Sequence, residues 1–149
     1  MYFIPPLLSA LALFSLSLNG QDGPVLYQTY CSACHGTQGQ GGAAEAVPPL
    51  ANSLWAQGDP DRMIKIVLHG LMGPIEVVGK EYNLVMPPQG AVLNDGQLAD
   101  ILSHIRTFDN GGEEVTAERV ASVRKKFKDR EAYWKADELL EDHPLPVKP

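Results

Sequence analysis

Apolar residues recur at helical spacing in three stretches between residues 23 and 108, and each stretch has its own start signal. The first begins at Gly23-Pro24, where proline suits an opening helical turn, and reaches Tyr30. The second begins at Asp59-Pro60, where the carboxylate can cap free backbone amides, and stops at Gly70. These signals predict two short helices with a long connection between them.

The third stretch has the most complete start signal. Asn94 can cap the helix, Gln97 stands at the capping-box position, and Leu93 with Leu98 can form a hydrophobic staple. Its apolar face consists of Leu98, Ile101, Leu102, Ile105 and Phe108. Before it, the segment from Ile75 to Leu84 predicts a small β-hairpin that turns at Gly79-Lys80. The pattern therefore predicts an all-α fold with one small β-hairpin.

A Gly-rich break at residues 109–112 separates a first part, residues 21–110, from a C-terminal extension, residues 111–149, that is dense in charges of both signs. Thr116 can cap a helix in this extension, and a shorter helix can hold Leu139 and Leu140. The apolar residues of the extension are Val120, Val123, Phe127 and Trp134. They either pack back on the first part or form a docking face for another protein, and helical spacing favours packing back.

The first 18 residues contain no charged side chain and are mainly apolar. After Pro5-Pro6, the run from Leu7 to Leu18 has the length of a signal-peptide core and falls short of the roughly 20 residues that span a bilayer. We therefore expect residues 1–20 to be a removed export signal, which makes the mature protein periplasmic or otherwise exported. The alternative is a retained N-terminal anchor, and only then is the membrane a partner.

The composition is that of one globular domain, with 149 residues, 44% apolar and 20% charged. The formal net charge is −6, so the chain repels phosphate backbones and anionic lipid headgroups. Nucleic acid is not an expected partner. A protein that docks on this surface should itself present a basic face, and salt should slow the encounter.

Residues 31–35 read Cys-Ser-Ala-Cys-His. C-x-x-C-H is the attachment sequence for c-type haem, in which two thiols add to the porphyrin vinyl groups and the histidine ligates iron. The spacing suits this chemistry, because cysteines three apart near a helix end lie on one side and can reach one edge of a macrocycle. Cys31, Cys34 and His35 are therefore predicted to hold one covalent haem c.

Two cysteines also allow three other interpretations, namely a thioredoxin-like redox pair, half of a zinc site, and a disulfide of an exported protein. The redox pair requires a strand before the dithiol in a βαβ pattern. The zinc site requires another ligand pair, whereas the chain has two cysteines in all. Haem attachment is favoured because it alone uses both cysteines and His35.

The sixth iron ligand decides between catalysis and electron transfer, because an open position binds small molecules and a second protein ligand closes it. Met86 is the favoured ligand. Pro87 and Pro88 stiffen its segment, and a weakly binding thioether needs a stiff loop. Other possible ligands are Met63, Met72, His69, His104 and His143. An iron left open is the remaining alternative.

Over residues 22–110 the sequence resembles the class I cytochromes c, in particular small exported bacterial ones that occur alone or fused to periplasmic dehydrogenases. The residues that carry the resemblance are Gly23, Tyr27, the Cys31–Gly36 motif, Pro48-Pro49-Leu50, Met86-Pro87, and Ile101, Ser103, His104 and Ile105 of the last helix. The resemblance implies a helical fold wrapped around one haem, in which the first and last helices cross. Gly23 and Tyr27 would then meet Ile101 and His104.

The resemblance also implies that a proline carbonyl accepts a hydrogen bond from the His35 imidazole, which orients the ring. Pro48 and Pro49 are both candidates for this carbonyl, and we count Pro49 among the haem-binding residues. Further candidate walls of the haem pocket are Leu50, Leu54, Trp55 and Tyr82.

These observations indicate an exported electron carrier and not an enzyme, with one haem iron that cycles between Fe(II) and Fe(III) while bound to His35 and Met86. The expected partners are redox proteins: a periplasmic dehydrogenase as donor, and an oxidase or another cytochrome as acceptor. One rival hypothesis is a haem enzyme or gas sensor with a labile sixth ligand. Another is a fixed haem subunit, docked on a dehydrogenase through residues 111–149.

Overall fold

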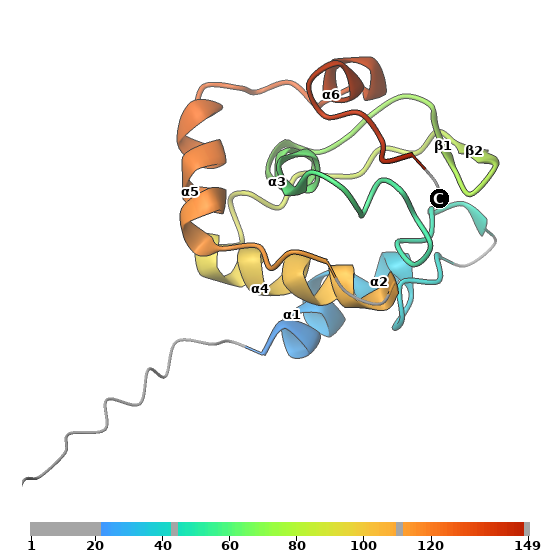
Figure 1. Cartoon of the computed structure of the whole chain (residues 1–149), viewed down its shortest axis with the longest axis horizontal. Coiled ribbons are helices and arrows are strands. Elements are labelled where there is room, and N and C mark those ends of the chain that lie inside the picture. Colours follow the sequence, from blue (N-terminus) through green and yellow to red (C-terminus); the bar gives the residue numbers. More distant parts are fainter. Residues whose placement is uncertain (1–21, 43–44, 110–111, 148–149) are drawn as a thin grey trace, which may run out of the picture.

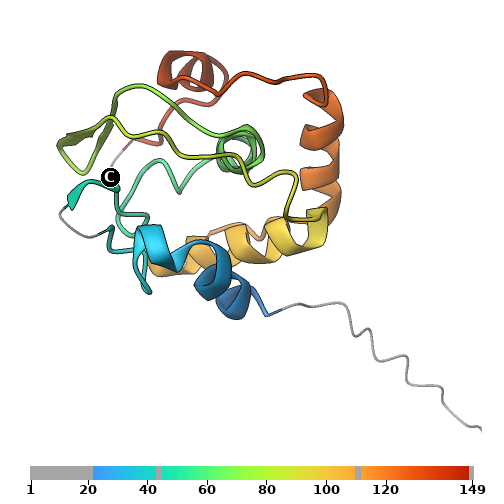
Figure 2. The same ribbon diagram turned by 180° about the vertical axis from the view of Figure 1, so that it is seen from behind.

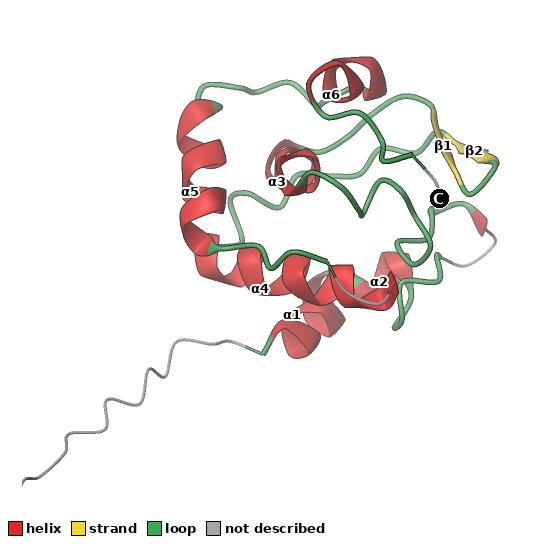
Figure 3. Ribbon diagram, in the orientation of Figure 1, coloured by secondary structure: helices red, strands yellow, loops and turns green. Residues whose placement is uncertain are grey.

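The computed structural model describes residues 22–42, 45–109 and 112–147, and the predicted export signal lies outside them. The elements are α1 (Gly23–Tyr30), α2 (Ser32–His35), α3 (Pro60–His69), β1 (Ile75–Val77), β2 (Lys80–Tyr82), α4 (Asp95–Arg106), the 3-10 helix η2 (Thr107–Asp109), α5 (Ala117–Lys126) and α6 (Ala136–Asp142). Within the described ranges, the β1–β2 pair is the only sheet (Figure 3). The predicted helical fold with a small hairpin is confirmed. None of the described helices has the length and apolar character needed to cross a bilayer.

Helix α3 runs through the middle of the molecule, with α4, α5, α6 and the hairpin around it (Figures 1 and 2). It begins where the sequence predicts, because the Asp59 side chain accepts a hydrogen bond from the Asp61 amide at 3.0 Å. It ends at Gly70, whose φ of +79° favours glycine. Residues 60 and 62–68 are all buried. A helix buried on every side can pack against different structures on its different faces.

Helices α1 and α4 cross at very close range, as predicted from the resemblance (Figure 1). A Cβ atom on Gly23 would stand 2.5 Å from the Asp100 carbonyl oxygen and 3.2 Å from the His104 Cβ, so only glycine fits there. Tyr27 is fully buried at the crossing and makes edge-to-face contacts with His104 and Phe108 at ring-centroid distances of 5.5 and 5.2 Å. The predicted capping box of α4 is present at Asn94.

The hairpin forms over the predicted segment, but its turn lies one residue earlier than expected. Val77 pairs with Lys80, so the two turn residues are Val78 and Gly79 and not Gly79 and Lys80. Both have positive φ, 50° and 74°, which is the geometry of a two-residue turn that matches the twist of the flanking strands. The side chain of the first turn residue is exposed and so meets no packing constraint.

The C-terminal extension packs back on the first part of the chain, as helical spacing favoured. Its side chains Val115, Val120, Val123, Trp134 and Leu139 are buried and belong to the same hydrophobic core as α1, α3 and α4. Helix α5 lies against both α3 and α4. Figure 1 shows the extension passing from α4 along α5 and over α3 to α6. Its apolar face is therefore used within the molecule.

Candidate functional site

An apolar cavity lies between α1, α2, α3, α4, the hairpin and the segment that carries Met86. Together with the solvent space at its open mouth, the cavity comprises about 1190 Å³. Its aliphatic and aromatic walls include Tyr30, Val47, Leu50, Trp55, Ile66, Val67, Leu71, Ile75, Val77, Tyr82, Leu84, Val85, Ile101 and Ile105. Three of the four wall residues predicted from the sequence border the cavity, and Leu54 does not.

Both cysteines and the histidine of the C-x-x-C-H sequence border this cavity. Cys31 ends α1 and its carbonyl accepts from the His35 amide at 2.9 Å, so the motif forms one tight helical turn. The two thiols are free, which argues against the disulfide interpretation. They follow a helix and not a strand, unlike a thioredoxin-like pair. Burial, and then the neighbouring Cys34, raise the pKa of the Cys31 thiol to about 11, so it is protonated at neutral pH.

The His35 ring is oriented by Pro48. Its Nδ1 lies 3.1 Å from the Pro48 carbonyl oxygen. A carbonyl oxygen only accepts, so Nδ1 carries the proton and Nε2 keeps its lone pair for a metal. Burial lowers the pKa of His35, against the opposing effect of the Pro48 hydrogen bond, and so favours the neutral, metal-binding imidazole. Of the two candidate prolines, Pro48 makes this hydrogen bond and Pro49 lines the cavity.

The loop after the motif, residues 36–42, folds tightly against the same turn. The Gly41 amide donates to the His35 carbonyl at 2.9 Å, and a Cβ on Gly42 would stand 2.5 Å from the Cys34 carbonyl oxygen. The Gly39 carbonyl accepts from the amides of Leu50 and Ala51 at 2.7 and 2.9 Å. The glycines of this loop therefore allow its backbone to lie close to the backbone of the motif and to residues 50 and 51. This close packing brings the Pro48 carbonyl within hydrogen-bond distance of His35.

Among the six possible second ligands, only Met63 and Met86 border the cavity. The three histidines are used elsewhere: His69 donates to the Arg130 carbonyl, His104 packs on Tyr27, and His143 binds Asp59. Met72 is 39% exposed. The structure thus narrows the possible protein ligands from six residues to two thioethers.

Hydrogen bonds hold the segment that carries Met86 at several points. The Met86 amide donates to the Leu71 carbonyl at 2.9 Å and the Leu71 amide donates back at 3.1 Å. Three residues further on, the Gln89 amide donates to the Val67 carbonyl at 2.8 Å. We define residues 86–90 as the methionine loop. Pro87 and Pro88 restrict its backbone angles, and this pairing with the end of α3 restrains it further.

From α3, sequence reasoning named Met63 as a possible ligand but did not place this helix in the wall of the cavity. Met63, Ile66 and Val67 all form part of that wall. Sequence reasoning also missed Arg62, which is fully buried and donates to the carbonyls of Leu54, Trp55, Gln57, His143 and Pro144. A charged residue inside an apolar helical run was the available signal for such a long-range anchor.

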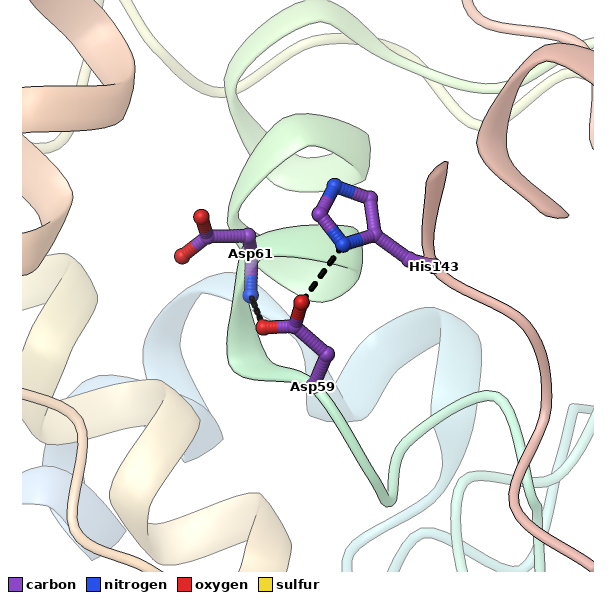
Figure 4. A group of neighbouring side chains, drawn as sticks. All are labelled: Asp59, Asp61 and His143. Atoms are coloured by element: carbon purple, nitrogen blue, oxygen red, sulfur yellow. Dashed lines mark hydrogen bonds and ion pairs between the residues drawn. The ribbon is translucent and has the colours of Figure 1, made fainter. Parts of the chain in front are cut away.

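A second cluster of possible metal ligands lies away from the cavity, where Asp59, Asp61 and His143 come together (Figure 4). Their ligand atoms all lie within 4.8 Å of one another. The two carboxylates already have a cationic partner, because Arg119 forms ion pairs with Asp59 at 2.7 Å and with Asp61 at 2.6 Å. This cluster fastens the C-terminal extension to the start of α3.

A sequence model of the family described as "Cytochrome C oxidase, cbb3-type, subunit III" matches residues 19–105. A cytochrome c-552 of Thermus thermophilus is 38% identical over 130 residues, which cover 80% of this chain and 86% of that relative. The chain belongs to the class I c-type cytochromes. Such cytochromes carry covalently attached haem c, and the chemistry of the cavity fits it: two free thiols and a neutral imidazole border one apolar space.

Two further relatives of this cytochrome are named as parts of larger enzymes. The gluconate 2-dehydrogenase cytochrome c subunit of Pantoea cypripedii is 39% identical over 114 residues, which cover 72% of this chain and 25% of that subunit. The fructose dehydrogenase cytochrome subunit of Gluconobacter japonicus is 30% identical over 110 residues, which cover 69% of this chain and 22% of that subunit. The cytochrome thus matches about a quarter of these longer subunits, and the comparisons support a role in electron transfer.

Proposed function

We propose that this cytochrome carries single electrons between exported redox proteins, with haem c attached through Cys31 and Cys34 and its iron bound by His35 and Met86. When bound, the haem supplies one iron that exchanges one electron between Fe(II) and Fe(III). The observation that carries the proposal is that one apolar cavity brings together the thiols, the imidazole and the thioether, which come from two segments about fifty residues apart.

Each protein group has a distinct task in this proposal. Pro48 keeps the proton on Nδ1 of His35 and so presents Nε2 as the ligand atom. The methionine loop presents a neutral thioether, which favours the reduced state more than a second histidine does. The apolar walls exclude water from the iron and disfavour its extra positive charge, which also raises the reduction potential. The chain is thereby suited to accept electrons from a dehydrogenase and pass them to an oxidase or another cytochrome.

Two protein ligands leave no position on the iron for a substrate, so we propose that the protein is not an enzyme. Both thioethers that border the cavity lie in well-fastened segments, Met63 within α3 and Met86 in the methionine loop. This arrangement opposes the labile sixth ligand of a gas sensor. The net charge of −6 favours a basic partner and a brief, salt-sensitive encounter.

The test is a spectroscopic and redox study of the full chain, produced in an export compartment with haem-attachment machinery. We expect a near-infrared thioether-to-iron band in the oxidised protein, a reversible one-electron titration, and no rapid carbon monoxide binding by the reduced protein. Rapid carbon monoxide binding without the near-infrared band would support a haem enzyme or gas sensor instead. Recovery of the signal-free chain from the exported fraction would support removal of residues 1–20.

A second candidate function is that of a haem subunit fixed on a dehydrogenase, which the names of two relatives favour. A fixed subunit would copurify with its dehydrogenase at high salt, whereas the diffusing carrier would elute alone. The buried apolar face of the extension supports the diffusing carrier, because Trp134 and Val120 already pack within the molecule.

A further inference from the structure

The C-terminal extension reaches the methionine loop through a shared backbone segment, residues 70–72. The Met86 backbone pairs with Leu71 on one side, and Trp134 of the extension pairs along the same segment in parallel. The Trp134 amide donates to the Gly70 carbonyl at 3.1 Å, and the Met72 amide donates to the Trp134 carbonyl at 2.9 Å. Residues 70–72 therefore pair with the methionine loop and also with the C-terminal extension.

Arg130 shapes the part of the extension that makes this pairing. Its guanidinium carbon lies 3.5 Å from the centroid of the Trp134 ring, and its nitrogens donate to the carbonyls of Ala132 and Tyr133 at 3.0 Å each. A Cβ on Gly70 would stand 2.6 Å from both the Tyr133 ring and the Met86 carbonyl oxygen. The extension and the methionine loop thus both lie close to the same glycine, which leaves no room for a side chain between them.

Arg124 fastens the other end of the methionine loop. Its guanidinium donates to the carbonyls of Gly90 and, at 2.8 Å, Leu93, and it forms an ion pair with Asp95 at 2.7 Å. Its side chain is about two-thirds buried, with 32% relative exposure, so solvent screens these bonds only in part. The extension is therefore linked to the methionine loop at two places. Near Met86 the link runs through Leu71, and at Gly90 Arg124 contacts the loop directly.

We propose that Arg124 and Arg130 are positioning residues for Met86, so that the C-terminal extension controls how firmly Met86 would be held as an iron ligand. This inference rests on the proposed His35 and Met86 ligation. A thioether binds iron weakly, and its retention depends on how rarely its loop moves away. Arg124 binds the loop directly at Gly90, and Arg130 holds the extension segment whose Trp134 pairs with Leu71 beside Met86. Both sets of charge-assisted bonds make that movement rarer.

The test compares three single substitutions in the holoprotein that remove the same charge: Arg124→Gln, Arg130→Gln and, as a matched control, Arg119→Gln. Arg119 also belongs to the extension and holds two carboxylates, Asp59 and Asp61, but it fastens the start of α3. In each variant the denaturant midpoint for loss of the near-infrared band is compared with the midpoint for loss of helix. Carbon monoxide association and exchange of the Met86 amide are measured in the reduced protein.

We expect Arg124→Gln and Arg130→Gln to lose the band before helix content falls, with carbon monoxide association and Met86 amide exchange faster by about tenfold. Arg119→Gln should lose band and helix together and keep both rates within about twofold of the original protein. If Arg130→Gln does not mature, Arg124→Gln carries the comparison, since it acts at the other end of the loop. The inference is overturned if the two variants behave as the Arg119→Gln control does. Absence of the band from the unsubstituted protein overturns the His35 and Met86 ligation, and this inference with it.

Discussion

Gly23 and Asp100 meet so closely that the α1–α4 crossing has no room for a methyl group, since a Cβ on Gly23 would stand 2.5 Å from the Asp100 carbonyl oxygen. The crossing packs α1 against α4, and Cys31 directly follows the last residue of α1. The position of the thiols thus depends on a residue that never touches the cavity.

Gly23→Ala should therefore push the helices apart and lower the free energy of unfolding by about 1–3 kcal/mol. Gly96→Ala is the matched control, because a Cβ there would meet nothing closer than Asn94 Oδ1 at 3.5 Å. That control should raise the free energy of unfolding by about 0.4–1 kcal/mol, through loss of chain entropy in the unfolded state. Denaturant unfolding measures both, and equal effects of the two substitutions would contradict the close crossing.

Tyr27 joins the same crossing to the haem motif, because its hydroxyl donates to the Gly36 carbonyl at 2.7 Å. Tyr27→Phe keeps the ring contacts and should cost about 1 kcal/mol of stability through the lost hydrogen bond. Burial, the chief cause, raises the pKa of Tyr27 from 10.0 to about 12. The protonated hydroxyl therefore stabilises the fold fully below pH 10, and this stabilisation is lost as the pH rises toward 12. Ultraviolet titration should show one late phenolate that is absent from Tyr27→Phe.

Asp59 should make the attachment of the C-terminal extension sensitive to acid. Burial alone would raise its pKa, but hydrogen bonds from the Asp61 amide and His143, with the charge of Arg119, outweigh this and lower the pKa below 3.8. The stabilisation is thus present above pH 3.8 and is lost as the pH falls through the lower pKa of the folded state. Asp59→Asn should be less stable than the original protein at neutral pH, and the difference should shrink in acid. A difference that does not change with pH would argue against an ionised Asp59 in this role.

Substituting the two thioethers that border the cavity should separate their roles. Met86→Ala should abolish the near-infrared band, admit carbon monoxide, and lower the reduction potential within the roughly 0.8 V range that axial ligands control. Met63→Leu conserves volume in α3 and should leave all three properties unchanged, with a stability cost below about 1.5 kcal/mol. Optical spectra and redox titration of the two variants give the answer. The opposite pattern would make Met63 the ligand.

The sequence predicted most accurately the features that depend on local chemistry. The Asn94 capping box and the Asp59 cap involve groups within three residues, and both formed as expected. The helix crossing at Gly23 was predictable only through the resemblance to a family. The hairpin turn lies one residue earlier than predicted. Gly79 marked the turn correctly, but the sequence did not show whether Val78 or Lys80 would be the other turn residue.

Features that join distant segments were not predictable from one sequence. Arg62 reaches carbonyls 81 and 82 residues away, and Arg124 reaches back 34 residues to Gly90. The apolar run around Arg62 could indicate burial but not its acceptors, and Arg124 looks like an ordinary surface charge until the fold brings its acceptors together. The choice between Pro48 and Pro49 was also open, because only the folded position of these prolines beside the motif decides which carbonyl faces His35.

Pyridine haemochrome spectra of the original protein, Cys31→Ala, Cys34→Ala and the double substitution show whether Cys31 and Cys34 each hold the haem. We expect the spectrum of two thioether bonds for the original protein and of one for each single variant, and we expect acidified organic solvent to extract haem from the double variant alone. If the solvent extracted the pigment from the unsubstituted protein, covalent attachment through these cysteines would be wrong.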